Sequence, residues 1–134
     1  MVCVYCKQPT KVTNTRPRRT GWSIWRRRWC QKCQLSFTTL ENMSVASAIA
    51  IKSPQGHLQP ANYSQIFISL YKALGNTRKD IEEAEYLALN VIDKLFKQQQ
   101  AILTTSFVKQ QIFETLNSYQ TKAGQRYLLE EMDD

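Results

Sequence analysis

The sequence predicts an α+β protein in which a small three-stranded β-module precedes a mainly helical domain. Four cysteines fall into two pairs within residues 1–33, and segments rich in β-branched and aromatic residues surround the second pair. After residue 62 apolar residues recur with a period near 3.6, as on the inner face of a helix. We therefore expect one domain over residues 1–43 and a second over residues 44–134.

The cysteines form two identical steps, C-V-Y-C at residues 3–6 and C-Q-K-C at residues 30–33. Each C-x₂-C step lets one tight turn aim two sulfurs at a single ion, so two steps complete a tetrahedral shell. The alternatives are two disulfides or a redox pair. We favour a metal, because nothing before the first cysteine resembles a secretory signal and two matching steps are unlike a lone redox motif. The predicted ligands of one structural Zn²⁺ are Cys3, Cys6, Cys30 and Cys33.

Three segments around these steps are expected to be strands, at residues 10–16, 23–29 and 35–40. Residues 17–21 carry turn chemistry between the first two. Three short strands closed by two metal-binding turns form a zinc ribbon. So short a segment cannot bury much apolar surface, so metal binding would supply much of its folding free energy.

Basic charge is concentrated in this predicted ribbon. Residues 1–41 contain nine lysines and arginines against one acidic residue, a net charge of +8, whereas the remaining residues carry nine basic and ten acidic side chains. Such asymmetry indicates a segment that faces a polyanion, although a solvated basic surface is the alternative. Guanidinium groups contact phosphates and read guanine edges. The candidate DNA-binding residues are Arg16, Arg18, Arg19, Arg26, Arg27, Arg28 and Lys32.

The arginine run lies between Trp25 and Trp29. Side chains alternate along a strand, which places Arg26 and Arg28 on one face and Arg27 with both tryptophans on the other. Exposed indoles can stack on bases. A ribbon this small needs apolar bulk, however, so we expect the tryptophans to supply its core.

The second domain is expected to begin with a strand over residues 45–52 and a turn over residues 53–56. Helices should then start near Asn62, at a Thr77–Asp80 capping box, and at Thr104 or Thr105. Gly75 should end the first helix. A shorter fourth helix is expected over residues 122–131, unless Gly124 weakens it. The predicted inner faces contain Tyr63, Ile66, Phe67, Leu70 and Leu74, then Ile81, Ala84, Leu87, Ala88, Val91, Leu95 and Phe96, then Val108, Ile112 and Leu116.

No constellation of residues indicates catalysis. The single histidine, His57, falls in a predicted turn, and the sequence contains neither a P-loop nor a G-x-G-x-x-G motif. Four cysteines on one metal leave no open position for an activated water. We expect a protein that is not an enzyme, and, without an apolar run of roughly 18 residues, one that is cytoplasmic and does not enter a membrane.

The first 41 residues resemble the NrdR family of bacterial repressors of ribonucleotide reductase genes, which combine a zinc ribbon with an ATP-cone. The resemblance rests on the two C-x₂-C steps, on Thr10-Lys11-Val12 and Arg16, on R-R-R-W-C at residues 26–30, and on F-T-T-L-E at residues 37–41. It implies zinc binding by the four cysteines and DNA contact by Arg26, Arg27 and Arg28. It further implies a homo-oligomer on double-stranded promoter or operator DNA, associated with the bacterial nucleoid.

The remaining residues resemble an ATP-cone, a small helical domain with a β-hairpin lid that binds ATP or dATP. The family typically opens this domain with Val-Lys-Arg-Asp-Gly, and here residues 51–56 read I-K-S-P-Q-G. The resemblance makes Lys52 and Gly56 candidate nucleotide-binding residues. Ser53 replaces the second basic residue, and Pro54 fixes φ and removes a donor.

Three hypotheses for function follow. In the first, nucleotide-dependent oligomerisation controls the affinity of the ribbon for DNA. In the second, the divergent cone is a nucleotide-free module for oligomerisation or protein docking. In the third, the chain is a zinc-ribbon adaptor or an accessory subunit of a nucleotide enzyme.

Overall fold

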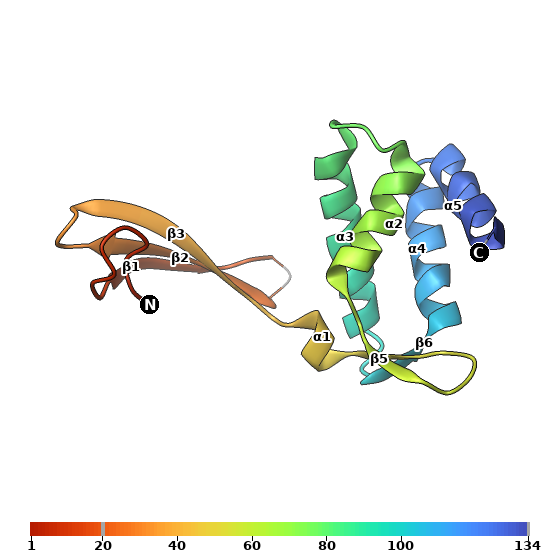
Figure 1. Cartoon of the computed structure of the whole chain (residues 1–134), viewed down its shortest axis with the longest axis horizontal. Helices are drawn as coiled ribbons and strands as arrows, with labels where there is room; N and C mark the ends of the chain where they lie inside the picture. The colour runs from red at the N-terminus through yellow and green to blue at the C-terminus, as the bar shows by residue number, and fades with distance from the viewer. Residues whose placement is uncertain (20, 134) are drawn as a thin grey trace. The chain divides into compact units, whose positions relative to one another are not determined.

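A computed structural model describes residues 1–19 and 21–133. It divides the chain into two compact units, Met1–Met43 and Ser44–Asp134, which we call the ribbon and the helical unit. Figure 1 shows an antiparallel sheet in the first unit and mainly helices in the second. The predicted α+β class is confirmed.

The ribbon is a three-stranded antiparallel sheet in the order β1-β2-β3. Its strands are β1 (Lys11–Pro17), β2 (Ser23–Cys30) and β3 (Leu35–Asn42), within one or two residues of the predicted segments. The register shifts between Val12 and Asn14, where a bulge lets Thr13 donate its hydroxyl to the carbonyl of Arg27 at 3.2 Å.

The expectation that the tryptophans form a core is wrong. In the part of the ribbon that the structure describes, only Cys3, Ser23 and Cys30 are buried. Trp25 and Trp29 remain half-buried. A single sheet has two faces, and among residues 1–19 and 21–43 no element forms a second layer that would close over either of them.

The helical unit begins with α1 (Val45–Ala48) and a small sheet. The predicted strand over residues 45–52 is therefore wrong in its first half. The Ser44 hydroxyl accepts a hydrogen bond from the Ser47 backbone N–H, which caps one helical turn in place of the strand. The strand is confined to β4 (Ala50–Lys52).

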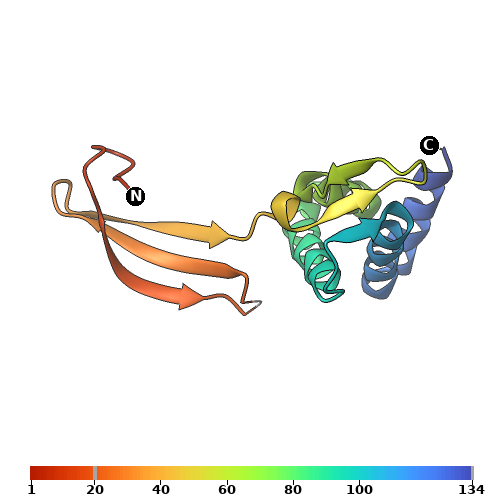
Figure 2. The same cartoon turned by 90° about the horizontal axis from the view of Figure 1, so that it is seen from below.

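Two further short strands flank β4, in the order β5-β4-β6. β5 (Leu58–Pro60) pairs antiparallel with β4 through the predicted turn, in which Gly56 has a φ of 88°. β6 (Ile102–Thr104) pairs parallel with β4. Figure 2 shows this sheet across one end of the helices.

Four helices make up the body of this unit: α2 (Tyr63–Leu74), α3 (Asp80–Phe96), α4 (Thr105–Tyr119) and α5 (Thr121–Asp133). The Asn62 side chain caps α2 by accepting from two backbone N–H groups, and Thr104 caps α4. Only half of the predicted capping box forms: the Asp80 carboxylate accepts from the Thr77 N–H at 2.9 Å. This contact and the Thr77 hydroxyl lower the pKa of Asp80.

The predicted inner faces of the helices meet in one apolar core. Its fully buried large side chains include Leu70 of α2, Ile92 and Leu95 of α3, and Leu116 of α4. One prediction is wrong, because Ile81 in the first turn of α3 is 45% exposed. No helix in the described residues is long and apolar enough to cross a membrane.

Candidate metal centre and nucleic-acid interface

The four cysteine thiols converge at one end of the ribbon. Their sulfur atoms all lie within 4.8 Å of one another, and the Cys6 and Cys30 sulfurs are 3.6 Å apart. Four ligands at a Zn–S distance of about 2.3 Å on a tetrahedron are separated by roughly 3.8 Å. All four cysteines are free of disulfides. The arrangement fits one structural Zn²⁺.

The two C-x₂-C turns share a buried first cysteine and a positive-φ residue after the second, but the N–H donor to the first sulfur is two residues on in one turn and three in the other. Cys3 and Cys30, the first cysteine of each, are buried, and each sulfur accepts a backbone N–H at 3.4 Å, from Tyr5 and Cys33 respectively. A residue with positive φ follows each second cysteine, Lys7 at 62° and Gln34 at 53°. This repeated geometry explains how a short sequence step aims both sulfurs inward.

Hydrogen bonding and burial shift the pKa values of Cys3 and Cys33 in opposite directions. Hydrogen bonding from the Cys6 backbone lowers the pKa of Cys3 to about 7. A side-chain hydrogen bond with Cys6, together with burial, raises the pKa of Cys33 to about 12. Thiols that hydrogen-bond one another at this distance cannot all lose their protons in the absence of a cation, because the thiolates would repel one another. A bound divalent cation would replace those protons.

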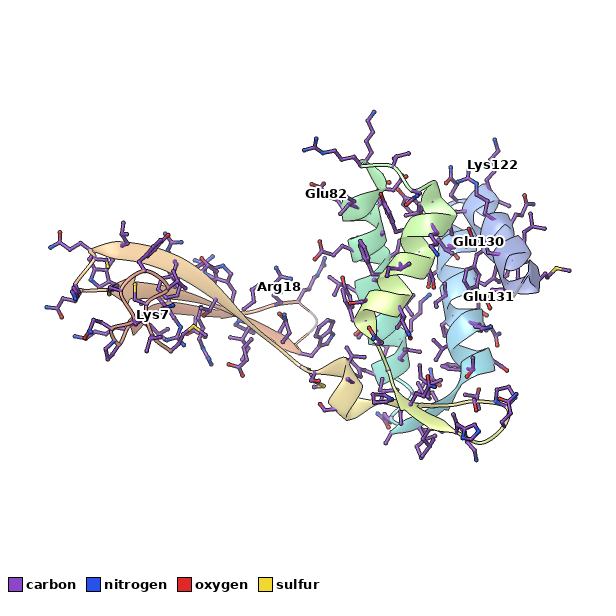
Figure 3. All side chains as sticks on the ribbon, viewed as in Figure 1. Lys7, Arg18, Glu82, Lys122, Glu130 and Glu131 are labelled. Atoms are coloured by element: carbon purple, nitrogen blue, oxygen red, sulfur yellow. The ribbon has the colours of Figure 1, made fainter. Side chains whose placement is uncertain are left out.

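The candidate DNA-binding residues extend along the whole ribbon. Lys32 lies in the second metal-binding turn, and Arg18 and Arg19 lie at the opposite end, after β1 (Figure 3 labels Arg18). Arg16 is on β1 and the arginine run is on β2. All are exposed except Arg26 and Arg28, which are half-buried.

The strand register separates two faces of the sheet. Directly paired residues share a face, and successive residues alternate. We call one the tryptophan face; it presents Lys11, Asn14, Arg16, Trp25, Arg27, Trp29, Ser36, Thr38 and Leu40. We call the other the Phe37 face; it presents Val12, Thr15, Ile24, Arg26, Arg28, Phe37, Thr39 and Glu41.

One arginine on the Phe37 face is paired with an acid and the other with a neutral hydroxyl. Arg26 forms an ion pair with Glu41 at 2.6 Å, and Arg28 donates to the Thr39 hydroxyl at 3.2 Å. Glu41 is the one acidic residue of residues 1–41, but the composition count does not show which side chain it contacts. Side chains alternate along β3, so Glu41 lies on the same face as Thr39, and Thr39 pairs with Arg26. This alternation is the signal that places Glu41 beside Arg26.

The helical unit contains a pocket of about 190 Å³. It lies between the hairpin of β4 and β5, which we call the lid, and helices α2, α4 and α5. Polar amides and hydroxyls line much of it, including Gln59, Gln65 and Thr105. Among the described lining residues Lys109 is the one cation, and it forms an ion pair with Glu131 of α5, which Figure 3 labels.

Neither candidate nucleotide-binding residue lines this pocket. Lys52 is exposed at the end of β4, where its carbonyl accepts a hydrogen bond from the Thr105 hydroxyl at 3.2 Å. Gly56 is exposed at the tip of the lid turn, next to His57. The sequence did not indicate Lys109, Tyr127 or Glu131 as site residues, because they follow Pro60 at the end of the hairpin by 49 or more positions.

A Cys₄ zinc ribbon rich in arginine, followed by a helical unit with a hairpin lid, defines a class of ribbon-bearing transcriptional regulator. A family model described as "Transcriptional repressor NrdR-like, N-terminal domain" matches residues 1–41. A transcriptional repressor NrdR of Bifidobacterium longum is 30% identical over 128 residues, which cover 95% of this chain and 85% of that protein. The chain belongs to the NrdR family of transcriptional repressors.

Other relatives of the same name show the same extent of similarity. The protein from Acidiphilium cryptum is 27% identical over 95% of this chain and 84% of its own length. The protein from a Geobacillus species is 29% identical over 95% and 83%. The similarity therefore includes both the ribbon and the helical unit.

Proposed function

We propose that this chain represses ribonucleotide reductase genes by binding double-stranded operator DNA through its ribbon. The observation that carries the proposal is the placement of seven exposed or half-buried basic residues on the strands and turns of one zinc ribbon. Zinc holds the sheet, and the sheet holds the arginines at fixed spacing. Guanidinium groups then neutralise phosphates and release condensed counterions.

Replacing Arg26, Arg27 and Arg28 with Ala tests this proposal. Each lost phosphate contact removes about 0.9 from the slope of log affinity against log salt, so the slope should fall by up to about 3. Affinity for promoter DNA should weaken substantially at low salt, while zinc content stays at one ion per chain.

A matched control removes the same charge from the helical unit by changing Lys72, Arg78 and Lys79 to Ala. These side chains are exposed and lie on α2 and in the turn before α3. This control should keep the salt slope of the parent. If the two triple variants bind promoter DNA alike, the ribbon is not the DNA-binding surface.

We further propose that the helical unit serves assembly or protein docking without tight nucleotide binding. The observation behind this proposal is the pairing of Lys109 with Glu131 inside the pocket. A triphosphate that enters would meet a carboxylate and a cation already neutralised. Losing one charge-assisted contact costs about 1.5–3 kcal/mol, a factor of ten or more in affinity.

Calorimetry with ATP and dATP, together with light scattering, tests the second proposal. The parent chain should bind neither nucleotide at micromolar concentration, and its oligomer size should not respond to them. Glu131→Gln should raise nucleotide affinity roughly tenfold by releasing Lys109, whereas Glu130→Gln, one residue away and exposed, should not. Micromolar binding by the parent that also shifts oligomer size would contradict this proposal and favour the hypothesis of nucleotide-dependent oligomerisation.

A further inference from the structure

The two faces of the ribbon differ in charge. The tryptophan face carries three cations, Lys11, Arg16 and Arg27, and none of its described residues is acidic. Arg27 donates only to the neutral Thr38 hydroxyl, at 3.2 Å, so its positive charge is uncompensated. The Phe37 face has two arginines and one glutamate, and the Arg26–Glu41 ion pair cancels one charge. The tryptophan face is thus the stronger anion-binding surface.

The tryptophan face also presents unusual apolar area. Trp25 and Trp29 are half-buried, and Leu40, which pairs with Trp25 across β2 and β3, is 48% exposed. Two indoles on an open sheet retain planar surface that a partner could cover. A contiguous apolar patch bordered by polar and charged side chains is typical of a binding surface.

Cations and indoles alternate on this face in both directions. Along β2, Arg27 lies between the two tryptophans; across the sheet, Arg16 pairs with Trp25 and Lys11 with Trp29. The indoles are four residues apart, which corresponds to about 13 Å on a strand. Open sheets with projecting aromatic side chains stack unpaired bases, and neighbouring cations follow the phosphates.

We propose that the tryptophan face binds a nucleic-acid strand with unpaired bases. One base stacks on Trp25 and another on Trp29, while the three cations of the face contact the phosphates around them. Bases inside a duplex are stacked about 3.4 Å apart and cannot lie on indoles separated by about 13 Å. The strand is therefore single or locally melted.

This activity stands beside the duplex binding proposed above and is separable from it. Duplex affinity depends on the basic side chains, which are shared, whereas stacking depends on the two indoles. A variant that lacks the indoles but keeps every cation distinguishes the two.

The parent chain offers a direct optical test, because its three tryptophans all lie within residues 22–29 of the ribbon. A single-stranded oligothymidylate should quench their fluorescence on binding. An abasic strand of equal length has the same phosphates without bases, so it should bind more weakly and quench little. Absence of quenching at saturating oligothymidylate, or equal affinity and quenching with the abasic strand, would overturn the proposal.

The variant test uses Trp25→Leu with Trp29→Leu, and Phe37→Leu as the matched control from the other face. Phe37 is also half-buried and aromatic on the same sheet. Each lost indole should weaken oligothymidylate binding roughly 5- to 150-fold, while duplex binding and its salt slope stay as in the parent. Zinc content and far-UV circular dichroism confirm that each variant is folded.

Two results of this comparison contradict the proposal. One is a zinc-loaded double variant that binds oligothymidylate like the parent. The other is a loss of equal size in the Phe37→Leu variant, which would assign the strand to the opposite face. A parent chain that binds oligothymidylate but not duplex promoter DNA would instead count against the operator-binding proposal alone.

Discussion

The ribbon and the helical unit are held together by different means. The described part of the ribbon buries three residues, two of which are cysteines of the metal centre. The helical unit buries apolar side chains from α2, α3, α4 and α5 around Leu70, Ile92 and Leu116. Metal coordination thus replaces a hydrophobic core in the first unit, as small domains often require.

This difference decides which surfaces remain available for binding. A helix that forms a core uses its apolar face to do so, and in the helical unit those faces are occupied. In the ribbon the metal orders the strands from one end, so both sheet faces stay open. Seven basic residues and two tryptophans can then serve recognition without weakening the fold.

Removal of a zinc ligand should produce the largest difference in stability between the ribbon and the helical unit. Cys30→Ser should leave an incomplete shell around the metal and unfold the ribbon, because zinc binding contributes on the order of 10 kcal/mol to such modules. The helical signal in circular dichroism should persist. Hydrogen exchange can locate the loss in residues 1–43.

Treating the parent with a chelator provides the control, since it removes the metal without a mutation. It should reproduce the exchange pattern of Cys30→Ser. A ribbon that keeps its amide protection without metal, or two disulfides in a metal-free chain, would show that the ribbon is held by something other than zinc.

The converse test acts on the helical core. Leu116 on α4 has no exposed surface, so Leu116→Ala should leave a cavity and lower the free energy of unfolding of the helical unit by about 2–5 kcal/mol. Zinc affinity should be unchanged, because the four candidate zinc ligands all lie in the ribbon.

Leu129→Ala is the matched control, because Leu129 on α5 is 64% exposed. It should change stability by less than about 0.5 kcal/mol. Coupled loss of zinc in the Leu116→Ala variant would mean that the two units do not fold independently.

The sequence was most informative where local chemistry determines structure. The repeated C-x₂-C step predicted the converging thiols, and the caps at Asn62 and Thr104 predicted two helix starts. Alternation along β2 predicted which face each arginine takes. In each case the signal lies within a few neighbouring residues, although the two C-x₂-C steps that meet at the metal centre are 24 positions apart from Cys6 to Cys30.

Long-range contacts were not predictable in the same way. β6 has three residues and exists because it pairs with β4, about 50 positions earlier. The Lys109–Glu131 ion pair similarly needs α4 and α5 side by side. Ser44 could be recognised as a helix cap, but a one-turn helix has too few residues to show a period.

The smallest expected effect on stability concerns Gly124, a residue type that weakens a helix interior. The helix continues through Gly124 because α5 passes close to α4 there: a Cβ at this position would lie 3.0 Å from the Cβ of Asn117 and 3.1 Å from its Cα. Glycine costs about 1 kcal/mol in a helix interior relative to alanine. The close approach of the two helices is what offsets that cost.

Gly124→Ala should therefore lower the free energy of unfolding of the helical unit, since overpacking costs about 1–3 kcal/mol and the gain in helix propensity recovers about 1. In an Asn117→Gly background the Cβ contact is gone but the contact with the Cα at 3.1 Å remains, so the same substitution should cost less than it does in the parent chain. Thermal denaturation of the four chains of this double-mutant cycle measures the coupling. A Gly124→Ala variant that is stabilised in both backgrounds would show that the helices can separate at no cost, and that the glycine is not required by packing.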